Sequence, residues 1–196
     1  VIREQADHSL AVMAGLGDGD VFTTVLATAP QRAIWLAINL ATAILAASVI
    51  AFYQDTIEKV VALAVLMPIV ASMGGIAGTQ SLTVLIRAMA MGQINDRTEI
   101  WLVRREIFVS IINGLIWAFV IAVIAAYWFD DTTLGLIIAF AIIINLITAG
   151  IAGASLPLIL DRLRIDPALA GGVVLTTITD VVGFFAFLGV ATYFYN

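Results

Sequence analysis

Five apolar stretches, each long enough to cross a bilayer, constrain this chain more than any other feature of its sequence. About 20 apolar residues span the ~30 Å hydrocarbon core as a helix. Short polar segments separate the stretches, so consecutive helices must run antiparallel, with no room for a soluble domain between them. The sequence therefore predicts an all-α membrane protein with five transmembrane helices. They cover residues 34–53, 60–91, 101–129, 134–160 and 168–195.

The composition supports a membrane protein independently of the helix lengths. The chain is 62% hydrophobic and 12% charged, with a mean hydropathy of +1.09. Soluble domains carry about 25% charged residues, and this chain has too few polar side chains to cover a water-facing surface. Cysteine is absent, which excludes disulfides and thiolate metal sites. The net charge of −5 is scattered and no basic stripe occurs, so we expect no nucleic-acid partner.

The basic residues predict how the helices are oriented. Lys59 alone falls on one side of the predicted membrane, where Asp130 and Asp131 also lie. By the positive-inside rule the amino terminus is cytoplasmic and the carboxyl terminus is outside, in a multi-pass protein of the inner (plasma) membrane. The basic residues on the predicted cytoplasmic side are Arg3, Arg32, Arg87, Arg97, Arg104, Arg105, Arg162 and Arg164.

Residues 1–29 differ from the rest of the chain. Residues 1–13 mix polar and apolar side chains at near-helical spacing, which predicts a short amphipathic helix, and glycines and aspartates at 15–20 interrupt it. There is no initiator methionine. We interpret residues 1–29 as the remnant of a cytoplasmic linker helix and residues 30–196 as a five-helix transmembrane pore domain, with further sequence expected upstream.

Asp180 is the most informative single residue, because it lies near the middle of the last apolar stretch. A charged side chain at the bilayer midplane costs about 2.5–3.5 kcal/mol on insertion scales, and it usually marks a cation path, a proton relay or an ion pair. No lysine or arginine lies at a comparable depth in any predicted span, so a buried salt bridge is not expected. A protonated Asp180 that hydrogen-bonds a neighbour is the structural alternative.

The second predicted span is interrupted near its centre. Pro68 lacks a backbone donor, and Gly74, Gly75 and Gly78 carry no side chains. Such a segment either lets another helix approach closely or turns backbone carbonyls toward a water-filled path. Polar side chains follow on its cytoplasmic half: Thr79, Gln80, Ser81 and Thr83.

The fifth predicted span has a matching face. Helical spacing places Gly172, Thr176, Asp180, Gly183 and Phe187 on one side of it. This face is small or polar on the cytoplasmic side of the aspartate and apolar beyond it. Threonine hydroxyls in such a helix also bond to carbonyls of the preceding turn, which is a purely structural role.

Other polar residues in the spans have structural interpretations. Asn39, Asn113 and Asn145 are expected to form hydrogen bonds between helices. Arg104 and Arg105 are expected to extend toward the membrane interface. An intramembrane enzyme would need a second catalytic carboxylate, a nucleophile–base pair or a histidine, and we expect none of these here. We therefore predict that the chain is not an enzyme.

Two motifs carry a family resemblance. Residues 67–81, followed by Ile86 and Arg87, resemble the second helix of MgtE-type magnesium channels, and residues 166–169 and 179–183 resemble their fifth. The resemblance covers essentially the whole chain. It implies five membrane helices per subunit and a homodimer, with a pore at the two-fold axis lined by the second and fifth helices. It also implies cytosolic amino-terminal and CBS sensor domains upstream, joined by a plug helix whose end residues 1–13 resemble.

The resemblance also implies a function and a site. The family's pore carboxylate corresponds to Asp180, which is the expected metal-binding residue. We expect hydrated Mg²⁺, and also Mn²⁺ or Co²⁺, to pass into the cytoplasm through a dimeric pore with a midplane aspartate pair. The alternative is a proton- or Na⁺-coupled divalent-cation carrier that uses Asp180 as its coupling site. The residues expected to line the pore and contact the hydrated ion are Gly75, Gly78, Thr79, Thr83, Gly172, Thr176 and Gly183.

Overall fold

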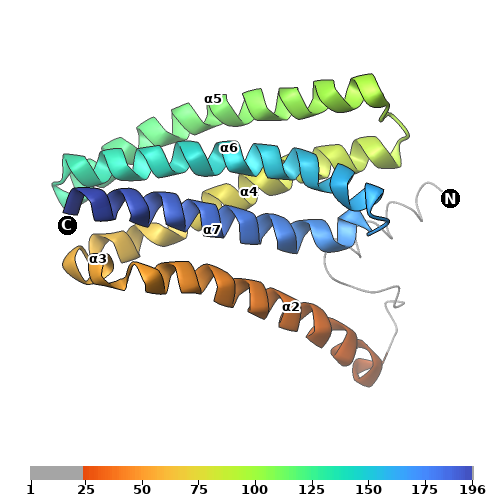
Figure 1. Cartoon of the computed structure of the whole chain (residues 1–196), viewed down its shortest axis with the longest axis horizontal. Coiled ribbons are helices and arrows are strands. Elements are labelled where there is room, and N and C mark those ends of the chain that lie inside the picture. Colours follow the sequence, from red (N-terminus) through yellow and green to blue (C-terminus); the bar gives the residue numbers. More distant parts are fainter. Residues whose placement is uncertain (1–23, 196) are drawn as a thin grey trace.

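A computed structural model describes residues 24–195, and all of its regular structure is helical (Figure 1). Five of the helices are long and apolar enough to cross a membrane, which confirms the predicted number within the described residues. The helices are α2 (Val25–Phe52), α3 (Gln54–Lys59), α4 (Ala62–Ala90), α5 (Asp96–Phe129), α6 (Thr132–Arg162) and α7 (Pro167–Tyr195).

The structure differs from the sequence-based expectation in the two helices that precede α4. Helix α2 begins at Val25 rather than at residue 34 and continues through Pro30, so the expected boundary between residues 29 and 30 falls inside a helix. The expected linker at 1–23 lies outside the described residues. The polar connection 54–59 is the short helix α3, with Asp55 in its first turn and Lys59 in its last. A negative charge at the first turn and a positive charge at the last turn interact favourably with the helix dipole and stabilise the helix.

Side-chain caps explain where α5 and α6 begin. The Asn95 carboxamide oxygen accepts hydrogen bonds from the backbone N–H groups of Arg97 and Thr98, and the Thr98 hydroxyl accepts one from the Asn95 N–H. This capping box starts α5 at Asp96, ahead of the apolar stretch that predicted a start at 101. The Asp131 carboxylate accepts hydrogen bonds from the N–H groups of Thr133 and Leu134 and caps the start of α6.

Helix α6 lies at the centre of the bundle and packs against α4, α5 and α7 (Figure 1). The main core gathers side chains that are almost fully buried, including Leu63 and Leu66 of α4, Ile138 and Ile142 of α6, and Phe187 of α7. Helix α2 lies at the edge and diverges from α7 toward its own amino-terminal end (Figure 1). Helices α4 and α7 are therefore neighbours on one side of the central helix, and they run antiparallel.

Candidate functional site

A line of small and polar residues runs along α7. Gly172, Thr176 and Asp180 are spaced four residues apart and are all half-buried. The Thr176 hydroxyl donates to the Gly172 carbonyl at 3.1 Å. Asp180 has no hydrogen bond or ion pair with any residue between 24 and 195. The chain therefore places an unpaired carboxylate in the middle of a membrane-spanning helix.

A second line with the same spacing runs along α4. The Thr79 hydroxyl donates to the Gly75 carbonyl at 2.8 Å, and the Thr83 hydroxyl donates to the Thr79 carbonyl at 2.7 Å. Both threonine side chains are exposed on the surface of the single chain. Because each hydroxyl proton is used within the helix, the hydroxyl oxygens point outward as acceptors.

The two lines meet where α4 crosses α7. A Cβ built at Gly75 would lie 3.9 Å from the Thr176 methyl carbon, so these two predicted residues are adjacent. The helices are antiparallel (Figure 1), so Asp180 lies about one turn beyond this contact, toward the level of Ser72. Ser72 is exposed on the same face of α4 and was not among the predicted site residues. Its position one turn before Gly75 is the signal that could have identified it.

Two of the predicted pore-lining glycines lie elsewhere. Gly78 is buried, and a Cβ there would lie 2.8 Å from a methyl carbon of Leu175. Gly183 is also buried, and a Cβ there would lie 2.7 Å from the Asn145 amide nitrogen. The structure therefore places Gly78 and Gly183 at close helix contacts rather than on the two polar lines.

Asn145 of α6 lies at the junction of α4 and α7, on their buried side. Its amide nitrogen donates to the Val70 carbonyl of α4 at 2.7 Å, and its side chain fills the space beside Gly74 and Gly183. This confirms the expected interhelical hydrogen bond for Asn145, which is fully buried. For Asn113 that expectation is wrong, because its amide donates to the Val109 carbonyl of its own helix.

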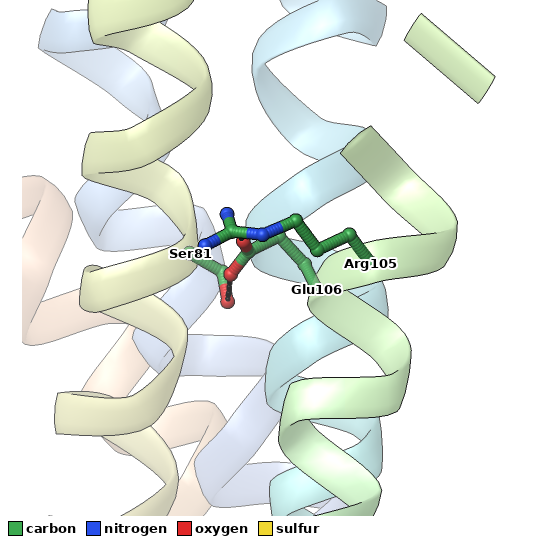
Figure 2. Close-up of polar contacts among 3 residues, drawn as sticks. All are labelled: Ser81, Arg105 and Glu106. Atoms are coloured by element: carbon green, nitrogen blue, oxygen red, sulfur yellow. Dashed lines mark hydrogen bonds and ion pairs between the residues drawn. The ribbon is translucent and has the colours of Figure 1, made fainter. Parts of the chain in front are cut away.

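Glu106 was not among the residues predicted from the sequence. This residue of α5 is buried, accepts a hydrogen bond from Ser81 of α4, and pairs with Arg105 (Figure 2). Arg105 extends across Glu106 toward α4 and forms an ion pair with the Glu106 carboxylate, whereas sequence reasoning gave Arg105 only a role at the membrane interface (Figure 2). In the sequence, the adjacent Arg105 and Glu106 resemble an ordinary charged pair at a membrane interface, which hides the burial of the carboxylate.

Comparisons with known proteins agree on one family. The MgtE family, described as "Divalent cation transporter", matches residues 67–190. The chain is 35% identical over 195 residues to the magnesium transporter MgtE of Bacillus subtilis, covering 99% of this chain and 43% of that protein. It is 32% identical over 182 residues to the magnesium transporter MgtE of Thermus thermophilus, covering 90% of this chain and 40% of that protein.

The matched region contains both polar lines, Asp180 and the Asn145 junction between α4, α6 and α7. The chain spans about two fifths of the length of the relatives it matches. On the extent of the family match and of the identity, the chain belongs to the MgtE family of divalent cation transporters.

Proposed function

We propose that this chain is the pore-forming part of a magnesium transporter that moves hydrated Mg²⁺ into the cytoplasm. The observation that carries the proposal is Asp180, a half-buried carboxylate in a membrane-spanning helix with no partner among residues 24–195. A charge in that position is costly unless something compensates it. A cation passing along α7 supplies that compensation, and the magnesium transporters to which the chain is similar make Mg²⁺ the first candidate.

The polar lines suit a cation that keeps its water. Mg²⁺ dehydrates reluctantly and is usually bound with several waters retained. Metal-bound waters are hydrogen-bond donors, and the outward hydroxyl oxygens of Thr79, Thr83 and Thr176 are acceptors, because their protons are held by helix carbonyls. The described residues contain no cluster of three or more histidine, aspartate or glutamate side chains that could enclose a bare ion. Water-mediated contacts to Asp180 therefore fit better than direct coordination by one chain.

The exposed face of α4 supports a homodimer. Ser72, Thr79, Gln80 and Thr83 are exposed polar side chains on a helix that is long and apolar enough to span the membrane. Against lipid tails, the Gln80 carboxamide and the acceptor lone pairs of the hydroxyls would have no hydrogen-bond partners. A second copy that applies the same face across a two-fold axis would enclose it, and the pair of Asp180 carboxylates would oppose the charge of one Mg²⁺.

The charge distribution supports the proposed orientation. Lys59 lies at the end of the bundle where α3 ends, and the arginines lie toward the opposite end (Figure 1). By the positive-inside rule, the end of the bundle that carries the arginines faces the cytoplasm when the protein lies in the inner (plasma) membrane. These arginines are Arg32, Arg87, Arg97, Arg104, Arg105, Arg162 and Arg164.

The length of the relatives supports additional upstream domains. They are more than twice as long as the segment that this chain matches. We propose that cytosolic amino-terminal and CBS sensor domains precede the membrane part in the full protein, with the residues ahead of α2 as the connection. Membership of a transporter family confirms that the chain is not an enzyme.

The proposal is tested by ion flux into proteoliposomes that contain the purified chain and a Mg²⁺-sensitive dye. Flux through a channel follows the Mg²⁺ gradient and the voltage, and it persists when proton and Na⁺ gradients are collapsed. A coupled carrier, the alternative that an unpaired midplane carboxylate also allows, stops under those conditions. Empty liposomes and parallel assays with Mn²⁺ and Co²⁺ provide the background and the selectivity. No Mg²⁺ entry above background would refute the proposal.

A further inference from the structure

Glu106 lies in a setting that requires explanation. The residue is only 5% exposed, within the membrane-spanning part of α5. The Ser81 hydroxyl donates to one carboxylate oxygen at 2.9 Å, and an Arg105 guanidinium nitrogen donates to the other at 2.9 Å (Figure 2). A buried carboxylate is expensive even when it is paired. Both oxygens of Glu106 are engaged, so the group is arranged to hold its neighbours rather than to receive an ion.

Three helices converge at this point. On α6, a Cβ at Gly150 would lie 3.2 Å from the Glu106 carbonyl oxygen of α5, and one at Gly153 would lie 2.5 Å from the Gly78 carbonyl oxygen of α4. Helices α4 and α5 therefore both approach the backbone of α6 at neighbouring levels. The hydrogen bond from Ser81 to Glu106 joins α4 to α5 and closes the third side of this triangle.

Part of the boundary between α4 and α5 is open. A cavity of about 410 Å³ lies along it, lined by Ile76 and Gln80 of α4 and by Glu106, Asn113 and Trp117 of α5. Both helices pack mainly on α6 and make few contacts with each other. Buried leucines of α4, among them Leu66, Leu82 and Leu85, hold it against α6 and α7. On the side that faces α5, the hydrogen bond from Ser81 to Glu106 is the polar contact that anchors α4.

Helix geometry connects this bridge to the polar line on α4. Ser81 lies between Thr79 and Thr83 in sequence, two residues from each, and two residues correspond to about 200° of rotation. Ser81 is accordingly buried against α5 while the two threonines are exposed on the opposite face. Anchoring Ser81 inward keeps both threonines outward.

We propose that Glu106 is a positioning residue that holds Ser81, fixes the rotation of α4, and so keeps Thr79 and Thr83 on the face that contacts the ion. Arg105 compensates the charge of the buried carboxylate. That this face lines the ion path rests on the proposed function, whereas the rotation of α4 can be measured without any transport.

The absence of native cysteine in this chain makes the rotation measurable with single introduced cysteines. Thr83→Cys reports the exposed face of α4, and Leu85→Cys reports a position that is fully buried. In the otherwise unchanged chain, a charged thiol reagent is expected to label the first rapidly and the second slowly. Ser81→Ala and Glu106→Ala are each expected to remove this difference in labelling rate between the two positions. Glu106→Gln retains an oxygen that accepts from Ser81 and is expected to preserve it, and Ser110→Ala, a buried α5 serine one turn away, is the matched control.

Transport by the variants without cysteine separates positioning from simple stability. Ser81→Ala and Glu106→Ala are expected to change the ratio of Mg²⁺ to Mn²⁺ flux, with Glu106→Gln restoring it. The proposal is overturned if the unchanged chain shows no difference in labelling rate between the two cysteine positions. It is also overturned if that difference persists in both alanine variants. Loss of the difference in labelling rate with an unchanged ratio of Mg²⁺ to Mn²⁺ flux also overturns it, because α4 would then rotate without effect on the ion path. If the unchanged chain carries no Mg²⁺, the proposed function fails, while the labelling result still decides the role of the bridge.

Discussion

Replacement of Gly153 by alanine tests the close packing that holds α4 against the central helix. The new Cβ would lie 2.5 Å from the Gly78 carbonyl oxygen, 2.9 Å from Ser81 Cβ and 3.2 Å from the Leu82 backbone nitrogen. Two of these are backbone atoms, so no side-chain rotation relieves the contact. Restoring the first distance to 3.4 Å, where ordinary contacts begin, requires α4 and α6 to separate by about 0.9 Å.

The expected magnitude combines two opposing terms. Overpacking of this kind costs about 1–3 kcal/mol, while alanine is a better helix former than glycine by about 1 kcal/mol. Because these contacts are with backbone atoms and a Cβ, the upper part of the overpacking range applies, about 2–3 kcal/mol, and the free energy of unfolding should fall by about 1–2 kcal/mol. At about 2–4 °C per kcal/mol for a chain of this size, Tm should fall by roughly 2–8 °C.

The assay is fluorescence-monitored thermal unfolding of the purified chain in detergent. Gly75→Ala is the matched control, because it also lies inside a membrane helix but its Cβ would meet the nearest neighbouring side chain only at 3.9 Å. Its Tm should be unchanged or slightly raised. A Gly153→Ala chain as stable as the unchanged protein, or an equal loss in both variants, would refute the packing argument.

Two further substitutions probe the polar contacts. Asn145→Ala removes the hydrogen bond to the Val70 carbonyl and should lower the free energy of unfolding by about 1 kcal/mol, measured by the same thermal assay; an unchanged Tm would contradict this. At the end of the bundle, the Tyr195 hydroxyl bond lowers the pKa of Asp131, assisted by the Leu134 N–H and opposed by burial. A lowered pKa stabilises the fold above the unfolded value of about 3.9, and that stability is lost as the pH falls through the folded value. The Tm difference between the unchanged chain and Tyr195→Phe should therefore be largest at neutral pH and narrow below about pH 4; a difference independent of pH would contradict it.

The long helices could be predicted because length and apolar composition nearly determine a membrane span. Their ends could not be predicted equally well, since they depend on caps and local tolerance. The Asn95 capping box extends α5 beyond its apolar stretch, and α2 continues through Pro30. Apolar composition determines where a membrane span begins, whereas capping contacts determine where its helix begins, so the two boundaries differ.

Spacing alone predicts which residues of a helix lie on one line, while their role in the site stays a prediction. Helical periodicity places Thr176 and Asp180 on one line, and the structure agrees. A glycine, by contrast, indicates close approach without saying which helix approaches, so periodicity could not separate Gly75 from Gly78 or Gly183. The burial of Glu106 could not be predicted for a related reason. It depends on how α4 and α5 approach α6 and not on the neighbours of Glu106 in the sequence.

The central claim is that Asp180 faces the ion and supplies the charge that draws it through the membrane. The most direct test is Mg²⁺ flux into proteoliposomes for Asp180→Asn, which keeps the side-chain shape and removes the charge. Thr179→Val is the matched control on the same helix, because the Thr179 side chain is fully buried within the chain, away from the line of Thr176 and Asp180. We expect Asp180→Asn to lose Mg²⁺ flux while remaining folded, with flux retained in the control. Unchanged flux in Asp180→Asn would contradict the claim and leave Asp180 a structural residue.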